Sequence, residues 1–387
     1  MEFNFDNPIS RDGTNSVKFD GRREYFGTTR VTPLWVADMD FAVPECVTRA
    51  LQARLDHPVY GYSLYPESLY ESIIEWFARR HQWNIEREWI IMAPGVVPSL
   101  FAAVQAFAKE SEGVIVQPPV YFPFFSAVTT NHRQLILNPL REINGHYEID
   151  FAHLESCAQQ GATLLMLCTP HNPVGRVWTE QELQEILRIA RHYSLTIFSD
   201  DIHADLVYPG ATHTMLGRLA QPGDKIITAI APNKTFNIPG LGLSALIIPD
   251  AHQRQAMKHA FETLHASNSN PFSIVAFEAA YRGGDTWLNA LLQYLESSRN
   301  FVVEYLQQHC PSIKVIKPEA TYLLWLDCRE LNMDDVQLRQ FFIQDCQVGM
   351  NPGNVFGDAG CGFMRMNIGT QKAVIKEALL RIVKRLA

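Results

Sequence analysis

Five short apolar segments recur along the middle of this chain, and amphipathic helical stretches separate some of them. The segments read GVIVQPPVYF, TLLMLCTPHNP, LTIFSDDI, KIITAIAP and LSALIIP, and several are rich in β-branched residues. Short continuous apolar runs of this kind are typical of strands buried on both faces, as in a parallel sheet covered by helices. The pattern therefore predicts an α/β fold with a mostly parallel central sheet.

One stretch between these segments, TEQELQEILRIARHY at residues 179–193, predicts an amphipathic helix with a well-defined start. Thr179 can cap its first turn, and Glu182 stands at the position that a capping box requires. After Gly283 and Gly284 the pattern changes to a long helical run and then to the strand-like pieces IKVIK and TYLLWLDC. This change predicts a second, smaller domain.

The composition restricts the class of protein. The chain has 387 residues, of which 47% are hydrophobic and 19% charged, which is enough for two domains and a large core. A net charge of -8 without a Lys/Arg-rich run argues against a nucleic-acid partner. The seven cysteines show no C-x-x-C spacing, which favours reduced thiols. There is no secretory signal pattern and no apolar run of membrane-spanning length. We therefore expect a cytoplasmic protein without a membrane or nucleic-acid partner.

Four polar or aromatic side chains follow four of the predicted strands. They are Tyr121, Asn172, Asp200 and Lys234. The carboxyl ends of the strands are where open α/β sheets bind ligands, so these side chains are expected to meet at one edge. Each also has an ordinary interpretation: a half-buried tyrosine, a turn former, a helix cap and a solvated lysine.

Pyridoxal phosphate needs these four kinds of group. A lysine amine forms a Schiff base with its aldehyde, and a carboxylate keeps its ring nitrogen protonated. A neutral donor serves its phenolic oxygen, and an aromatic ring covers its face. Its phosphate binds backbone N–H groups at a helix start. In APGVVPSLFAAVQAFA, Gly95 permits close approach and the amides of Val96 and Val97 open the predicted helix, although an ordinary turn explains this glycine equally well.

The chain resembles a known family through several motifs that stand in the order the family has them. They are YGYSLYPESLYESIIEWFARRHQW, PGVVPSL, HNPVGRVWT, SDDIHADLVY, NKTFNIPGLG, TYLLWLD and RMNIG. These motifs look like the class I/II aminotransferase family of fold-type I pyridoxal-phosphate enzymes, and more narrowly its MalY/PatB branch, the cystathionine β-lyases. The likeness runs from PLWVADMDF almost to the C-terminus. It implies pyridoxal 5'-phosphate as cofactor and a large cofactor-binding domain at 49–284. It also implies a smaller α+β domain, of which the N-terminal arm at 1–48 is one part and residues 285–387 are the C-terminal part.

The resemblance implies a role for each matching residue of the cofactor site. Lys234 would form the Schiff base, Asp200 would pair with the pyridine nitrogen, and Asn172 and His203 would lie near the phenolic oxygen. Tyr121 would stack on the ring and count among the catalytic residues. Gly95, Val96, Val97 and Asn233 would contact the phosphate.

Three further residues are implied to serve the substrate or the partner subunit. Tyr62 would reach the phosphate and the substrate from the neighbouring subunit of a homodimer with shared active sites. Arg365 would bind the substrate α-carboxylate, for which its planar fork is suited, although a structural ion pair is the alternative. Ala37 would line the substrate site.

Several positions depart from the family pattern. Asp201 stands where the branch usually has glutamate, and Ala93, Ala231 and Asn233 stand where hydroxyl residues often help to hold the phosphate. The phosphate is therefore expected to depend more on backbone amides, Asn233 and Tyr62. Together with Asp200, the residues Asp201, His203 and Asp205 can also be interpreted as a metal cluster. We expect no metal there, because so short a strand-to-loop run cannot easily aim four side chains at one ion.

The resemblance favours one reaction over two alternatives. The expected function is β-elimination from a sulfur amino acid such as cystathionine, which gives pyruvate, ammonia and a thiol. An aminotransferase on the same fold is the first alternative, because both reactions begin with loss of the α-proton. A regulatory protein that retains the fold is the second, and the joint presence of Lys234, Asp200 and Arg365 argues against it.

Overall fold

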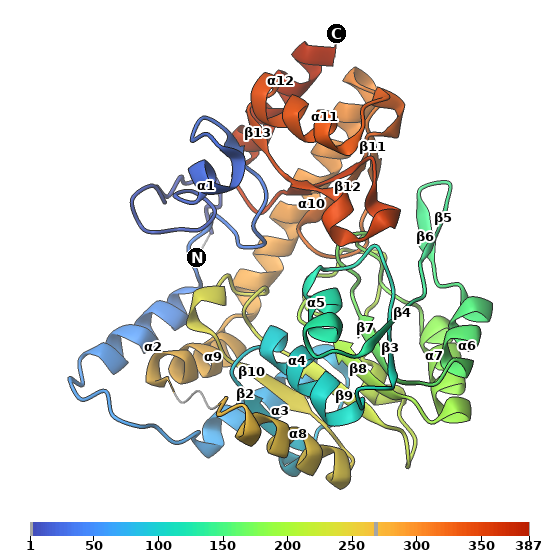
Figure 1. Cartoon of the computed structure of the whole chain (residues 1–387). Coiled ribbons are helices and arrows are strands. Elements are labelled where there is room, and N and C mark those ends of the chain that lie inside the picture. Colours follow the sequence, from blue (N-terminus) through green and yellow to red (C-terminus); the bar gives the residue numbers. More distant parts are fainter. Residues whose placement is uncertain (1–2, 267–269, 387) are drawn as a thin grey trace.

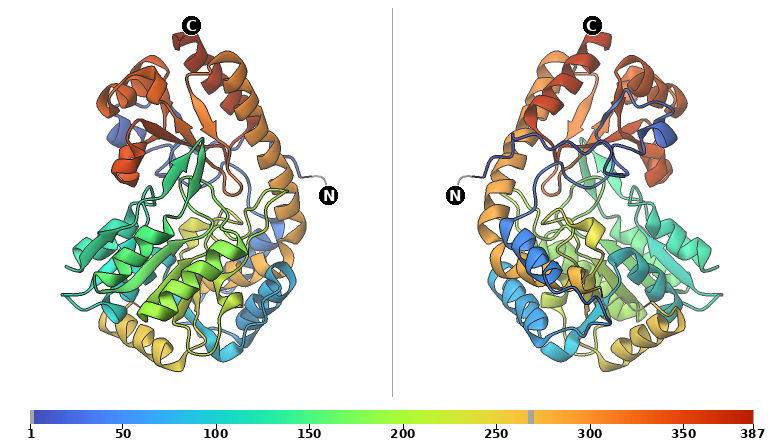
Figure 2. Two further views of the ribbon diagram at one scale, coloured as in Figure 1. Left: turned by 90° about the vertical axis from the view of Figure 1, so that its right-hand side faces the viewer. Right: turned by 90° about the vertical axis from the view of Figure 1, so that its left-hand side faces the viewer.

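A computed structural model of the protein describes residues 3–266 and 270–386. Its two halves are each built around a separate sheet, and the long helix α10 (Asp285–His309) runs from one half to the other (Figures 1 and 2). The strands of the larger sheet lie between residues 90 and 247, and those of the smaller sheet between residues 314 and 367. The predicted domain boundaries at 48 and 284 stay predictions.

The larger sheet has seven strands in the order β2-β10-β9-β8-β7-β3-β4. Pairing from β4 to β9 is parallel, and only β10 runs antiparallel to its neighbours. The mostly parallel sheet predicted from the apolar segments is therefore confirmed, and those segments form β3, β7, β8, β9 and β10. The bounds are β2 (Ile90–Ala93), β3 (Gly113–Val116), β4 (Gln134–Leu137), β7 (Ala162–Cys168), β8 (Thr196–Asp200), β9 (Ile226–Ile230) and β10 (Ser244–Ile247).

Helices cover both faces of this sheet because alternate residues of its strands point to opposite sides. Val114 belongs to the apolar cluster under α4, α5 and α8, whereas its neighbour Ile115 belongs to the cluster under α6 and α7. The capping box predicted for α7 is present, with Thr179 and Glu182 bonded reciprocally. The helix bounds are α2 (Glu45–Leu55), α3 (Glu67–His81), α4 (Val96–Phe107), α5 (Pro123–Thr130), α6 (Phe151–Gln159), α7 (Glu180–Tyr193), α8 (Ala251–Thr263) and α9 (Pro271–Gly283).

The smaller sheet is antiparallel, in the order β11-β12-β15-β14. The N-terminal arm joins this half, because β1 (Thr32–Pro33) pairs with β13 (Val348–Gly349). In Figures 1 and 2 the arm accordingly lies beside the C-terminal elements. The other bounds are α1 (Arg22–Phe26), β5 (Arg141–Ile143), β6 (His146–Glu148), β11 (Lys314–Ile316), β12 (Leu323–Asp327), α11 (Asp335–Gln340), β14 (Asn351–Pro352), β15 (Phe363–Asn367) and α12 (Lys372–Leu386).

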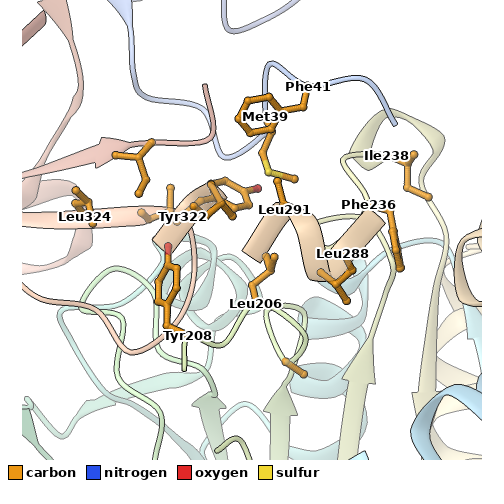
Figure 3. Close-up of a cluster of buried hydrophobic side chains, with 14 of the residues drawn as sticks. Met39, Phe41, Leu206, Tyr208, Phe236, Ile238, Leu288, Leu291, Tyr322 and Leu324 are labelled. Atoms are coloured by element: carbon orange, nitrogen blue, oxygen red, sulfur yellow. The ribbon is translucent and has the colours of Figure 1, made fainter. Parts of the chain in front are cut away.

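One apolar cluster joins the two halves. It includes side chains of α3, α9, α10, α12, β12 and β15. Figure 3 shows Leu288 and Leu291 of α10 among these side chains, with Phe236 and Ile238 from the loop after β9 and Tyr322 from the smaller half. The cluster therefore packs the loop that carries Lys234 against α10, where the ring of Phe236 lies 6.0 Å from that of Trp287.

Candidate active site

Lys234 lies in the turn after β9, as its position behind KIITAIAP predicted. Its amine is half-buried and donates a hydrogen bond to the Ala37 carbonyl at 2.7 Å. Burial, with a smaller contribution from the Arg365 charge, lowers the pKa of the Lys234 amine to about 8, although Asp38 and Asp200 oppose the shift. A lysine with a lowered pKa is available as a neutral nucleophile or base near neutral pH.

Asp200 is the last residue of β8, between Cys168 on β7 and Ala229 on β9. It is buried, and its Oδ1 accepts a hydrogen bond from the Ile202 N–H at 3.2 Å. Burial is the main reason why the pKa of Asp200 rises to about 7, and the charge of Asp201 adds to it. A buried carboxylate in this position would be stabilised by a cationic group placed beside it.

Arg365 comes from the middle of β15, opposite Trp325 and Asn351 in the smaller sheet. Its side chain crosses to the larger half, where one Nη donates to the Asn172 Oδ1 at 3.1 Å. The other Nη donates to the Trp35 carbonyl at 3.1 Å and to the Asn351 Oδ1 at 2.8 Å. The residue is only 3% exposed, and burial lowers the pKa of Arg365 to about 10. This guanidinium is therefore charged at neutral pH and largely removed from water.

His203 and Tyr121 complete this group of side chains. His203 is buried, and burial, together with the charges of Lys234 and Arg365, lowers the pKa of its imidazole to about 3. Tyr121 lies between β3 and α5, where burial raises the pKa of its phenol and the charges of Arg365 and Asp200 act on it. The structure therefore brings Lys234 and Arg365 close to His203, and Arg365 and Asp200 close to Tyr121.

Two buried nitrogen atoms at this site have no hydrogen-bond partner within the described ranges, namely Nδ1 of His203 and Nε of Arg365. Buried polar atoms normally have a partner, and a polar ligand bound at this site would supply one for each of these two. Together with the lysine amine and the buried carboxylate of Asp200, they form a donor and acceptor set that suits pyridoxal phosphate.

The proposed phosphate end lies at the same edge of the larger sheet. Gly95 directly precedes α4, so the amides of Val96 and Val97 belong to the four at a helix start that have no intrahelical acceptor. Register places this turn near β9, since Ala93 pairs with Ser244 on β10 and the adjacent Ala245 pairs with Ile230. Asn233 is partly buried in the turn that carries Lys234. Anion binding by these groups stays a prediction.

Tyr62 lies away from any packing within its own chain. It stands in the loop between α2 and α3, and its side chain is 106% exposed. The structure contains a single subunit, so the expected contribution of Tyr62 to a neighbouring active site stays a prediction.

Tyr322 was not among the site residues predicted from the sequence, although it belongs to the motif TYLLWLD. Its buried hydroxyl donates to the Ala37 carbonyl at 2.8 Å, the same oxygen that accepts from Lys234. Its ring lies 6.4 Å from that of His203, measured between centroids. The one signal in the sequence was a tyrosine directly before an apolar strand.

The four residues considered as a metal cluster bond in different directions. Asp201 accepts from Ser199 and contacts His213 at 2.9 Å, whereas Asp205 accepts from Trp76 and Thr235 and contacts His81 at 2.8 Å. In the part of the chain that the structure describes, no three such ligands come together around a common point.

Residues 29–382 match the family described as aminotransferase class I and II. The chain belongs to this family. It is 41% identical over 381 residues to cystathionine beta-lyase PatB of Bacillus subtilis (strain 168), with 98% of each chain covered. It is 30% identical over 384 residues to protein MalY of Escherichia coli (strain K12), again with 98% of each chain covered.

The solved structures agree with the family assignment. Cystalysin from Treponema denticola, whose crystal structure contains a pyridoxal 5'-phosphate cofactor, superposes with a TM-score of 0.97 at 37% identity. The match covers 100% of this chain and 99% of cystalysin. The resemblance to the MalY/PatB branch and the fold-type I expectation are therefore confirmed. Among the described helices, none is both long and apolar enough to cross a membrane.

Proposed function

We propose that this chain is a pyridoxal-phosphate-dependent carbon–sulfur β-lyase that acts on sulfur amino acids such as cystathionine. The observation that carries the proposal is the grouping of Lys234, Asp200 and Arg365 in a chain 41% identical to a cystathionine β-lyase. The site residues also suit the cofactor, because His203 and Arg365 hold buried nitrogen atoms that have no partner among the described residues. Pyridoxal phosphate supplies, when bound, an electron sink that stabilises the carbanion left by loss of the α-proton.

Each residue of the site has a separate task in this proposal. Lys234 would hold the cofactor aldehyde, and its amine, whose pKa is lowered to about 8 in the cofactor-free chain, would serve as the base for the substrate α-proton. Asp200 would keep a negative charge beside the ring nitrogen of a bound cofactor. Tyr121 would cover the cofactor ring, and Asn172 and His203 would serve its phenolic oxygen.

The substrate is bound at its α-carboxylate and oriented for elimination. Arg365 binds that carboxylate with its planar fork, in a setting where burial has removed competing water. The Ala37 carbonyl, which accepts from Lys234 and Tyr322, lines the same space. The reaction breaks the Cα–H and Cβ–S bonds, and the thiol leaves with a proton. Hydrolysis of the three-carbon enamine then consumes one water and gives pyruvate and ammonia.

The proposal extends to assembly and location. The loop between α2 and α3 exposes Val59, Tyr60, Tyr62 and Leu64, and exposed large apolar side chains close together in one loop support an interface there. We propose a homodimer in which Tyr62 reaches the cofactor phosphate of the partner subunit.

The seven cysteines all have free thiols, which supports a reducing compartment such as the cytoplasm.

The deciding experiment is a product assay with cystathionine and the purified holoenzyme. Pyruvate, ammonia and homocysteine should appear in equal amounts without a second substrate, and the Lys234→Ala variant is the inactive control. A product ketoacid that retains the substrate side chain, with turnover only after a second ketoacid is supplied, would instead make the protein an aminotransferase.

A further inference from the structure

The segment Trp35–Phe41 has no regular secondary structure, yet each of its backbone carbonyls accepts a hydrogen bond from a side chain. An irregular segment inside a protein needs partners for its backbone groups, and side chains provide them here. The donors, in segment order, are Arg365, Asn367, Lys234 with Tyr322, Lys18 with Asn367, Arg11 with Asn237, Gln371 and Asn237.

Two of these donors belong to the proposed active site. Lys234 donates to the Ala37 carbonyl, and Arg365 donates to the Trp35 carbonyl. These two carbonyls lie two positions apart in the sequence, and two residues span at most about 7 Å even when fully extended. An α-amino acid carries its amine and carboxylate on one carbon, so it needs an amine site and a guanidinium only a few ångströms apart. The segment is a shared support for both groups.

Two cations of the N-terminal arm hold the other side of the segment. Lys18 is 0% exposed, and its Nζ lies 3.1 Å from both carboxylate oxygens of Asp40 and 3.9 Å from Asp38 Oδ1. Arg11 pairs with Asp38 at 2.7 and 2.9 Å and with Asp40 at 2.8 Å. The two cations balance the two carboxylates, and loss of one cation would leave buried negative charge without its partner.

The side chains of the segment divide between two environments. Met39 and Phe41 point into the apolar cluster that includes Leu288 and Leu291 of α10 (Figure 3), whereas Asp38 and Asp40 point to the arm. Apolar packing therefore anchors the segment independently of the ion pairs. Removal of an ion pair should loosen the carbonyls without unfolding the chain.

We propose that Arg11 and Lys18 are positioning residues for the amino-acid substrate. Through Asp38 and Asp40 they hold the Trp35 and Ala37 carbonyls, and these keep Arg365 and Lys234 at the spacing that an α-amino acid requires. This inference rests on the proposed function of the same site, although it concerns binding and applies equally to a lyase and to an aminotransferase.

The test compares two ligands that differ only in the number of groups they present. α-Aminoisobutyrate carries both amine and carboxylate but no α-proton, so it can replace Lys234 on the cofactor aldehyde without going on to elimination, whereas isobutyrate carries the carboxylate alone. In Arg11→Gln holoenzyme, the dissociation constant of α-aminoisobutyrate should rise ~10-fold, and that of isobutyrate should change less than ~2-fold, because only two-point binding depends on spacing. Arg11→Lys should recover part of the loss.

Amide hydrogen exchange of the cofactor-free protein provides a second readout. The amides of Met39 and Asp40 donate to Asn237 and to the Gly369 carbonyl, and in Arg11→Gln they should exchange ~10-fold faster. The matched control is Arg22→Gln, because Arg22 belongs to the same arm and pairs with Asp12 without contacting the segment. Both its exchange and its ligand binding should equal those of the wild type.

The same pattern is expected for Lys18→Met, which tests the buried cation separately. For either residue, three outcomes would overturn the inference: an equal rise in the dissociation constants of both ligands, unchanged binding of both ligands, or the same loss of α-aminoisobutyrate binding in Arg22→Gln. A failure of the cystathionine assay would leave these measurements interpretable, because neither ligand binding nor amide exchange requires elimination.

Discussion

Replacement of Arg365 by alanine should reduce activity through loss of one specific ion pair with the substrate. The guanidinium is 3% exposed, so its interaction with a carboxylate is weakly screened. Two unit charges 4 Å apart interact by about 4 kcal/mol at an effective dielectric constant of about 20. Loss of one partner of such a pair costs roughly 2 to 5 kcal/mol in other proteins. This corresponds to a decrease of roughly 30- to 5,000-fold in kcat/KM.

The assay measures kcat/KM for cystathionine by continuous detection of pyruvate. The same enzymes are then tested for binding of an amine that has the cystathionine side chain but lacks the α-carboxylate. The Arg365→Ala variant should bind this amine about as well as the wild type, because the ligand has no charge for Arg365 to pair with. Arg365→Lys should be intermediate, because lysine keeps the charge but not the bidentate geometry.

Stability needs its own control. Arg365 also donates to Asn172, Asn351 and the Trp35 carbonyl, so alanine would leave these acceptors unpaired. Arg329→Ala is a matched control, because Arg329 likewise lies 4.8 Å from the centre of a phenylalanine ring in the same half, but pairs with Asp327. It should keep wild-type kinetics. The assigned role is wrong if kcat/KM of Arg365→Ala stays within about threefold of the wild type. It is also wrong if the variant binds the carboxylate-free amine as poorly as it binds cystathionine.

Four further results are expected. The wild-type holoenzyme should be yellow, and borohydride reduction followed by mass spectrometry should place the cofactor on Lys234; a label on another lysine would contradict this. Asp200→Ala should still bind some cofactor but exchange the substrate α-proton with solvent at least ~100-fold more slowly, and an unchanged rate would mean that another carboxylate serves the ring nitrogen. Mixed dimers of Tyr62→Ala and Lys234→Ala subunits should regain activity, because each hybrid restores one intact site; confirmed hybrids without activity would argue against sharing. Burial raises the pKa of Asp200 to about 7 in the folded cofactor-free protein. Between about pH 4 and 7 the folded protein therefore keeps a proton on Asp200 that the unfolded chain has released. For this reason Asp200 destabilises the fold increasingly as the pH rises through this range. The unfolding free energy of Asp200→Asn, measured by urea denaturation, should therefore increase relative to that of the wild type from pH 4.5 to 7.5. A constant difference over this range would show that the pKa of Asp200 is not raised in this way.

The sequence alone was sufficient to predict five of the seven strands of the larger sheet and the residues that follow them at its carboxyl edge. Apolar runs of strand length specified β3, β7, β8, β9 and β10, because a strand buried on both faces has to be apolar throughout. Parallel strands end at a common edge, so the residues that follow them, such as Asp200 and Lys234, were expected there from local pattern alone.

Tertiary structure decided how the second half completes the site. Arg365 meets Asn172 across 193 residues of sequence, and Lys234 meets the Ala37 carbonyl across 197. Such contacts depend on how the smaller sheet packs against the larger one, and hydrophobic periodicity indicates only which side of an element is buried. Backbone carbonyls have no side-chain signature at all, so the contact of Tyr322 with Ala37 and the arm cations around Asp38 were visible only once the chain had folded.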